Sequence, residues 1–272
     1  MSIRSAIGII LIGCAMSLIG CNLQDRLLYY PESRVPSATE LSALNLRFWP
    51  SGPDGYRGFT GAAETATGKG TVIVFHGNAG TAADREYYLR PLHAMGYRVI
   101  LAEYPGYGAR KGALGEKSFV DDARETIRIA SGQYREQIFL LGESLGCGVA
   151  AGAAADPALK IDGLVLITPW DTLRSVAQTH FPWFPVGLFL KDRYDNPENL
   201  RSFRGKIAVV GAERDEIVPI RHAHALFRPL TGKKRMWVLP GVGHNDWPMR
   251  VDTGMWLEWM NFLEEKKPLT TP

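Results

Sequence analysis

The sequence predicts an α/β domain with a mostly parallel central sheet, helices on both faces and a small cap after the sixth strand. Three observations favour this class: short apolar runs alternate with helical patterns, a glycine-flanked serine directly follows one run, and polar loops follow others. The chain has 272 residues, 46% of them hydrophobic and 22% charged, which suits one globular domain with a large core. Its net charge of +3 comes from interspersed signs, so no basic stripe indicates a nucleic-acid partner.

The expected strands and helices alternate along the chain. Residues 46–49 and 56–60 are expected to form an antiparallel start at one edge of the sheet. The stretch 118–131 illustrates how helices are inferred, because its apolar residues recur every three or four positions. The strands expected after this start cover 71–75, 97–102, 137–141, 164–167, 206–210 and 235–239, and the expected helices cover 85–95, 118–131, 147–155 and 220–227.

Residues 142–146, Gly-Glu-Ser-Leu-Gly, fit the G-x-S-x-G pattern of a nucleophile elbow. An apolar run precedes them and a run of small residues, 147–155, follows, so the context is strand, sharp turn and helix. Glycines at both ends of the pattern keep Cβ atoms out of a crowded turn, and Ser144 can then hold a strained backbone with its hydroxyl exposed. An ordinary glycine-rich turn would fit the pentapeptide alone, but this context favours a catalytic serine.

A serine hydroxyl is a poor nucleophile at neutral pH, so it needs a base, and the base needs an orienting acid. Asp215 and His244 lie in loops after the expected strands 206–210 and 235–239. In an open parallel sheet, the carboxyl ends of the strands form the edge where ligands bind. The order Ser, Asp, His therefore predicts a catalytic triad. Asp171, just after the sixth strand, is the rival candidate for the acid.

The expected oxyanion hole consists of backbone amides. One is the amide of Leu145, the residue after the nucleophile, and the other is the amide of Asn78 in the loop after strand 71–75. His76, in the same loop, is expected to shape the loop by hydrogen bonds rather than to act as a second base. His222 and His224 fall in an expected helix and are predicted to be surface residues.

These motifs resemble the α/β-hydrolase superfamily. Within it they are most similar to the single-domain branch of protein depalmitoylases, serine aminopeptidase-like proteins and bacterial lipoprotein hydrolases, over about residues 25–265. Glu103 departs from the pattern, since many relatives carry Asp there, and no catalytic consequence is expected. The matching segments are His76-Gly77-Asn78-Ala79-Gly80, Tyr104-Pro105-Gly106-Tyr107-Gly108, residues 142–146, Asp215-Glu216-Ile217-Val218-Pro219 and Gly243-His244-Asn245-Asp246.

The resemblance implies a serine hydrolase that cleaves carboxylic esters or thioesters through an acyl-enzyme. A peptidase or amidase is the alternative within the same scaffold, because the superfamily hosts all these activities. Glu143, beside the nucleophile, is an acidic group that could hold a substrate amine, so it leaves this alternative open. A different class, a non-catalytic envelope lipoprotein, is disfavoured because Ser144, Asp215 and His244 are all present. No cofactor and no metal site are expected.

The region 171–200 is the expected cap and the most aromatic part of the chain. Its prolines at 182 and 185 prevent one continuous helix over this stretch. Two interpretations stand: a helix that packs on the sheet through an aromatic face, or a small lid whose aromatic side chains line an acyl pocket. Asp192 and Asp195 are expected to be hydrogen-bonding loop residues. The pocket candidates are Tyr107, Trp170, Trp183, Phe184 and Phe189.

The amino terminus, residues 1–20, is predicted to be a lipoprotein signal peptide. One arginine precedes an apolar stretch too short for a typical membrane span, and Leu18-Ile19-Gly20-Cys21 resembles a bacterial lipobox. Cys21 would then carry lipid and begin the mature domain, 21–272. An uncleaved membrane anchor is the alternative. Asn22 lacks the aspartate associated with inner-membrane retention, which favours the periplasmic face of the outer membrane.

Cysteine usage agrees with export. Cys14 would leave with the signal peptide and Cys21 would be lipidated, so Cys147 would have no partner for an intramolecular disulfide. Cys147 is expected to be a buried small residue without a nucleophilic role. The expected partners are a small-molecule or acylated substrate and the membrane, and the protein is expected to be a monomer.

Overall fold

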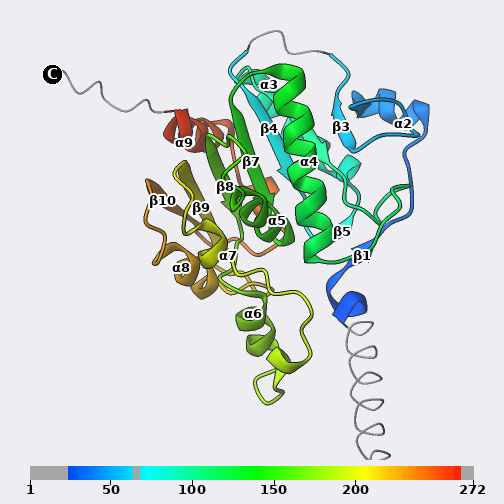
Figure 1. Ribbon diagram of the computed structural model, residues 1–272. Coiled ribbons are helices and arrows are strands. Elements are labelled where there is room, and N and C mark those ends of the chain that lie inside the picture. Colours follow the sequence, from blue (N-terminus) through cyan, green and yellow to red (C-terminus); the bar gives the residue numbers. More distant parts are fainter. Residues whose placement is uncertain (1–23, 64–67, 265–272) are drawn as a thin grey trace, which may run out of the picture.

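A computed structural model describes residues 24–63 and 68–264, and the predicted signal peptide and Cys21 lie outside them. Its centre is an eight-stranded sheet in the order β10-β9-β8-β7-β4-β6-β3-β2 (Figure 1). Strands β10 to β6 run parallel, and β3 is antiparallel to both of its neighbours. The strands are β2 (Leu46–Trp49), β3 (Gly58–Gly61), β4 (Thr71–Phe75), β6 (Arg98–Ala102), β7 (Ile138–Glu143), β8 (Gly163–Ile167), β9 (Lys206–Ala212) and β10 (Lys234–Leu239).

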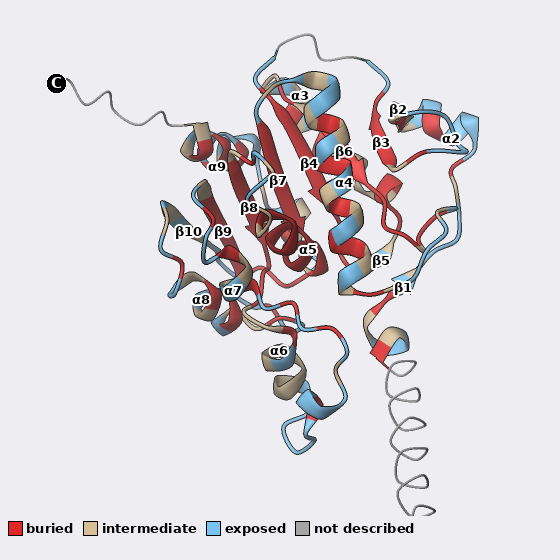
Figure 2. Ribbon diagram, viewed as in Figure 1, coloured by how far each residue is buried: buried red, intermediate tan, exposed pale blue. Residues whose placement is uncertain are grey.

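Helices cover both faces of this sheet. Side chains of the buried strands alternate between two apolar clusters, as the pleat requires; Ile73 faces one cluster while Val72 and Val74 face the other. The first cluster includes α4 (Glu116–Tyr134), α5 (Leu145–Ala154) and α8 (Arg221–Phe227), and the second includes η1 (Ala82–Tyr88), α3 (Leu89–Ala94) and α9 (Thr253–Glu264). Figure 2 shows the central strands as buried almost throughout.

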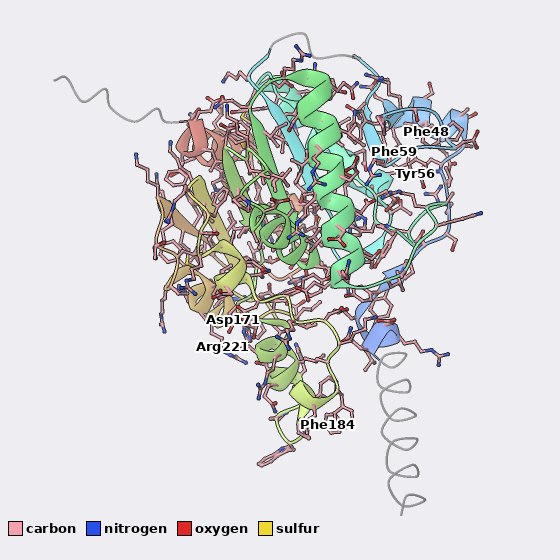
Figure 3. The ribbon with its side chains drawn as sticks, in the orientation of Figure 1. Phe48, Tyr56, Phe59, Asp171, Phe184 and Arg221 are labelled. Atoms are coloured by element: carbon pink, nitrogen blue, oxygen red, sulfur yellow. The ribbon has the colours of Figure 1, made fainter. Side chains whose placement is uncertain are left out.

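Smaller elements complete the chain. Helix α2 (Ala38–Ala43) precedes β2 at the antiparallel edge, where Phe48, Tyr56 and Phe59 form a cluster of ring contacts (Figure 3). Near the amino-terminal end of the described chain, β1 (Tyr30–Pro31) pairs in parallel with β5 (Ala79–Gly80), directly after β4. The short helix η3 (Trp247–Met249) follows the His244 loop.

The cap consists of α6 (Leu173–His180), η2 (Val186–Leu188) and α7 (Asn196–Leu200), between β8 and β9. Figure 1 shows α6 and the loop beyond it projecting from the end of the sheet. The predicted cap is therefore a real insertion. It is neither one long helix nor a helix lying on the sheet, because the chain turns at Pro182 and Pro185, and η2 continues only for one turn.

The sequence predicted the sheet closely and the helices less closely. Each expected strand overlaps an observed strand in the expected order. The expected helix 85–95 is instead a 3-10 helix followed by a short α-helix, because Arg85 leaves helical geometry with φ −109° and ψ 19°. The pairing of β1 with β5 was not predicted.

Candidate active site

The nucleophile elbow joins β7 to α5. Ser144 lies between them with φ +51° and ψ −113°, an unfavourable backbone for a residue with a side chain. The surroundings enforce this turn, because a Cβ on Gly146 would come within 1.9 Å of the Phe75 carbonyl oxygen, and one on Gly142 within 2.6 Å of Cys147 Cα. The Ser144 amide donates to the Ile167 carbonyl at 2.9 Å, which ties the turn to the end of β8.

A continuous hydrogen-bonded chain joins Ser144, His244 and Asp215. His244 Nε2 lies 2.9 Å from Ser144 Oγ, and His244 Nδ1 lies 2.7 Å from Asp215 Oδ2. A carboxylate oxygen only accepts, so Nδ1 carries the proton in this arrangement and Nε2 is free to accept from the serine. The three residues that the sequence singled out, far apart along the chain, therefore meet in the expected order.

The loops after β9 and β10 hold the acid and the base in place. Asp215 Oδ1 accepts from the amides of Ile217 at 3.0 Å and Val218 at 2.6 Å, which leaves Oδ2 for the histidine. The His244 amide lies 3.5 Å from Glu216 Oε2. Asp215 and His244 are both buried. A buried carboxylate with all its acceptors engaged is a fixed orienting group for the imidazole.

Asp171, the rival acid, does not contact His244. Its Oδ1 lies 2.8 Å from Nδ1 of His222, on α8. Burial alone would raise the pKa of Asp171, but hydrogen bonds from His222, Ser175 and the Thr172 amide outweigh it and lower that pKa. Asp171 is thus a structural partner of the cap.

The prediction that His222 is a surface residue was wrong. Its side chain is 4% exposed, and Nε2 lies 3.0 Å from Thr179 Oγ1 on α6. The helical pattern could not place it inside, because it is the packing of the cap against α8 that covers this side chain. His224 is exposed, as expected.

The loop of Asn78 is fixed from three directions. Its side-chain Nδ2 donates to the Leu28 carbonyl at 2.8 Å, and its own carbonyl accepts from the Tyr30 amide at 2.9 Å and from the Tyr107 hydroxyl at 2.7 Å. Leu145 is the first residue of α5, where backbone N–H groups have no acceptor within the helix. The sequence missed Leu28 and Tyr30, because nothing in their local pattern indicates a partner about fifty residues away.

His76 shapes this loop, as expected. Its Nδ1 lies 2.7 Å from the Gly77 carbonyl and its Nε2 lies 3.1 Å from Glu103 Oε1, with both side chains buried. Glu103 also accepts from the Ala82 amide at 3.1 Å. The pair therefore joins the end of β6 to the loop after β4 and to the start of η1.

Glu143, beside the nucleophile, belongs to a cluster that the sequence did not indicate. Its Oε2 accepts from the hydroxyls of Tyr87 and Tyr88, both at 2.9 Å, and lies 3.4 Å from Arg85 Nε. Arg85 in turn donates to the Ala79 carbonyl at 3.2 Å. Oε2 of Glu143 is thus engaged within the protein.

The predicted acyl pocket needs correction. Tyr107 is completely buried and Trp170 is 4% exposed, so neither lines an open pocket. Trp183 is 97% exposed, so its side chain lies in solvent and lines no pocket. Phe184 and Phe189 stack on each other, with ring centroids 5.0 Å apart, in the same projecting loop. The sequence identified aromatic residues but not their burial, which depends on how far the loop projects from the sheet.

Cys147 lies one turn into α5 and is buried. Burial raises the pKa of its thiol well above the ordinary value, and Sγ contacts the carbonyl oxygens of Gly142 and Ile167 at 3.1 and 3.2 Å. A thiol that stays protonated is a weak nucleophile. Within residues 24–63 and 68–264, no cluster of three His, Cys, Asp or Glu side chains could hold a metal ion.

Comparison with known proteins places this fold and site in a family. The family described as serine aminopeptidase, S33, matches residues 66–191, a stretch that includes Ser144 but ends before Asp215 and His244. An uncharacterized protein of Mycobacterium tuberculosis is 36% identical over 231 residues, covering 82% of this chain and 81% of that protein. The lysophosphatidylserine lipase ABHD12 of Bos taurus is 27% identical over 177 residues, covering 57% of this chain and 44% of the lipase.

Solved structures share the fold at lower identity. The esterase Pf2001 of Pyrococcus furiosus superposes with a TM-score of 0.62 at 19% identity, covering 85% of this chain and 98% of the esterase. A monoacylglycerol lipase of Paleococcus ferrophilus gives a TM-score of 0.55 at 19% identity, covering 72% and 95% of the two chains. The chain belongs to the α/β-hydrolase superfamily, as its motifs predicted. The family and these neighbours support a hydrolase of the esterase and lipase type.

Proposed function

We propose that this protein is a serine hydrolase that cleaves carboxylic ester or thioester bonds through an acyl-enzyme. The observation that carries the proposal is the hydrogen-bonded chain from Asp215 Oδ2 through His244 to Ser144 Oγ, at 2.7 and 2.9 Å. Both distances lie within the reach that proton transfer needs. The strained Ser144 backbone supports the same role, since strain of this kind is concentrated at functional sites.

In the proposed mechanism each of these groups carries out one step. Ser144 Oγ attacks the carbonyl carbon while His244 Nε2 takes its proton, and the oxyanion is held by the amides of Asn78 and Leu145. His244 then donates this proton to the departing alcohol or thiol as the carbonyl–leaving-group bond breaks. Water repeats the sequence on the acyl-enzyme and releases the acid. Asp215 stays ionised and stabilises the imidazolium.

An ester or thioester substrate is favoured over a peptide by the state of Glu143. This carboxylate was the acidic candidate beside the nucleophile for holding a substrate amine. Its Oε2 already accepts from two tyrosine hydroxyls and lies 3.4 Å from Arg85, so an incoming ammonium would compete with that guanidinium for the same carboxylate. A peptidase remains the second candidate because the matching family is described as serine aminopeptidase.

We infer that the acyl group comes from an amphiphilic substrate. The exposed aromatic side chains of the cap favour an apolar ligand, and the curated relative ABHD12 is named for an acyl-lipid hydrolase activity. The acyl chain length is the variable to measure, with p-nitrophenyl esters from acetyl to palmitoyl. We expect kcat/KM to rise beyond acetyl, and a preference for amino-acyl amides over every ester would favour the peptidase.

The test of the proposal is labelling with a fluorophosphonate, which reacts with an activated serine. The full chain should be labelled, and Ser144→Ala should lose both the label and several orders of magnitude in esterase rate. Absence of label on the wild-type protein would favour a non-catalytic envelope protein. A Ser144→Ala variant with near-normal esterase activity would refute the assignment of the nucleophile.

We also propose that the enzyme is tethered to a membrane through lipid on Cys21, in the cell envelope. Lipidation with more than one chain makes such attachment durable, whereas one chain alone is marginal. None of the helices that the structure describes has the length and apolarity needed to cross a membrane. Mass analysis and fractionation of wild type and Cys21→Ala test this proposal. Retention of residues 1–20 in the wild type, or unchanged processing and fractionation of Cys21→Ala, would contradict it.

A further inference from the structure

The loop beyond α6 carries an unusual concentration of exposed apolar side chains. Five of them lie within nine residues, and we call this set the apolar tip: Phe181, Trp183, Phe184, Leu188 and Phe189, with exposed fractions of 53%, 97%, 49%, 82% and 38%. Figure 3 shows Phe184 near the far end of the projecting segment, with Asp171 and Arg221 at its base. Large apolar side chains grouped in this way indicate an interaction surface.

The backbone of the apolar tip is largely satisfied within the tip itself. The side-chain amide of Gln178 donates to the carbonyl oxygens of Phe181, Pro182 and Phe184, at 3.0, 2.9 and 3.2 Å. The amide of Phe184 donates to the Phe181 carbonyl, and that of Leu188 to the Pro185 carbonyl, at 3.1 and 3.0 Å. Prolines at 182 and 185 have no N–H to satisfy. When such a segment moves from water into lipid, few backbone polar groups are left unpaired, so the free-energy cost of the transfer is low.

The charged residues within the stretch that carries the apolar tip are basic, although Lys191 pairs with Asp25 of the amino-terminal segment at 3.1 Å. No aspartate or glutamate lies between Asp171 and Asp192, whereas Arg174 and Lys191 lie within that stretch. Arg174 packs beside the tip, since a Cβ on Gly187 would lie 2.8 Å from its Nε. Basic residues next to an apolar insertion suit a bilayer with anionic headgroups.

The amino-terminal end of the described chain is held against the base of the same cap. Gln24 Oε1 accepts from the Lys191 amide at 2.7 Å, and Gln24 Nε2 donates to Asp192 Oδ2 at 2.6 Å. Cys21 precedes Gln24 by three residues, a distance that an extended chain covers in about 10 Å. Figure 1 shows this segment and the cap leaving the domain on the same side.

We propose that the apolar tip inserts into the interfacial region of a lipid bilayer, as a membrane contact separate from the lipid on Cys21. The occupant of the surface is thus the acyl and headgroup layer, with anionic lipid favoured by the exposed Arg174 beside the tip. A bilayer suits a projecting tip better than a second copy does, because insertion requires no complementary groove. Insertion of the tip would turn the carboxyl ends of the parallel strands, where Ser144 lies, toward the membrane, from which acylated substrates would come.

The experiment uses the full chain on vesicles of phosphatidylcholine with a minority of phosphatidylglycerol. Trp183 is the reporter, because it is the one exposed tryptophan among the seven, all of which lie in the described residues. Bromine on the acyl chains should quench a blue-shifted part of the emission, and Trp183→Phe should remove that part. Leu188→Asp should reduce the quenching about tenfold, since it places a charge where the proposal puts an apolar side chain in the bilayer. Leu257→Asp, on α9 and 41% exposed, is the matched control and should change nothing.

Other results would overturn the proposal, and one variant distinguishes the contact made by the tip from attachment through lipid on Cys21. Emission of Trp183 that stays open to aqueous iodide on vesicles and unquenched by brominated lipid overturns it. A photo-crosslinker at position 188 that couples two copies of the chain, rather than lipid, also overturns it. In Cys21→Ala, vesicle binding should fall while the quenching per bound molecule persists, so failure of the tether and failure of the tip give different results. Fluorophosphonate labelling tests the proposed hydrolase without reference to lipid.

Discussion

Two aspartates follow neighbouring strands of the sheet and each contacts a histidine, but only one of these histidines reaches a candidate nucleophile. His244 joins Asp215 to Ser144, whose backbone is strained and whose side chain is partly exposed. The second histidine, His222, meets the hydroxyls of Thr179 and Ser175 at 3.0 and 3.4 Å. Both residues lie within α6 without the positive φ of Ser144, and the Thr179 hydroxyl also donates to the Ser175 carbonyl and accepts from Arg221. The proposal that Asp215 and His244 are the catalytic pair, and Asp171 and His222 a structural one, therefore rests on the third residue of each set.

The two acids give a matched pair of variants. Asp215→Asn should lower kcat by about four orders of magnitude, because an amide cannot hold His244 in the tautomer with a free Nε2. Asp171→Asn should change kcat on a short soluble ester by less than about threefold, because its partner His222 does not contact Ser144. Steady-state rates of the two purified variants provide the comparison. The opposite ranking would transfer the acid role to Asp171.

A second prediction for single residues concerns the loop of Asn78. Tyr107→Phe removes the hydroxyl that holds the Asn78 carbonyl at 2.7 Å and leaves the ring in place. We expect kcat to fall about tenfold with little change in KM, because a misplaced oxyanion amide weakens binding of the transition state more than of the substrate. Tyr104→Phe is the control, since that hydroxyl contacts the His76 carbonyl instead. An equal loss in both variants would indicate general loosening of the loop.

Among the elements, α6 is fastened to the domain by polar contacts. Only Leu173 of this helix is buried, so few apolar contacts hold it. Its Thr172 cap, Thr179 and the nearby Asp171 form a hydrogen-bonded group with His222 and α8. The stability of a cap held in this way should depend on the ionisation of Asp171 more than the stability of the sheet does.

Acid should therefore loosen the cap first. The fold lowers the pKa of Asp171, so as pH falls through the ordinary range near 4 the unfolded form binds the proton first and the native contact loses its advantage. The stabilisation is fully present above about pH 5 and is lost as pH falls toward the lowered pKa. At neutral pH, Asp171→Asn should cost about 1–3 kcal/mol of stability and flatten this acid dependence. Urea unfolding of both proteins from neutral pH down to about pH 3 measures it, because the loss falls below the ordinary pKa near 4, and parallel curves would contradict the role of Asp171.

The sequence could predict the features that a local pattern encodes, and it could not predict those that depend on where the cap lies. Parallel strands were predictable because their apolar runs reflect burial on both faces, and the elbow was predictable because Gly142 and Gly146 leave a local sign of a crowded turn. The order of Ser144, Asp215 and His244 then followed from the loops. The burial of His222 and the exposure of Trp183 depend on where the cap projects, and no local pattern encodes that position.

For the whole molecule, the amino-terminal segment is the link between the cap, the oxyanion loop and the proposed tether. Tyr29 is buried against Phe119, and its hydroxyl donates to Asp192 at 2.6 Å. Burial, together with the proximity of Tyr194 and Asp192, raises the pKa of Tyr29 well above its usual value, so this hydroxyl remains a donor. Its neighbour Tyr30 forms the β1 pairing that holds Asn78. The segment is thus part of the core rather than a loose linker.

Variants of the neighbouring Tyr29 and Tyr30 test whether the amino-terminal segment is part of the core. Tyr29→Ala should cost about 3–5 kcal/mol of stability, because it empties a buried ring site and leaves Asp192 short of a donor. Tyr30→Ala, whose ring is 51% exposed and whose hydroxyl donates to the nearby Leu27 carbonyl, should cost less than about 1 kcal/mol. Chemical unfolding of the full chain measures both. A loss below about 1 kcal/mol in Tyr29→Ala as well would mean that the segment leaves the domain easily, and the proposed membrane tether at its start could then not fix the orientation of the enzyme. The expected difference would mean that the segment is part of the folded domain, so that the proposed tether restrains the domain itself.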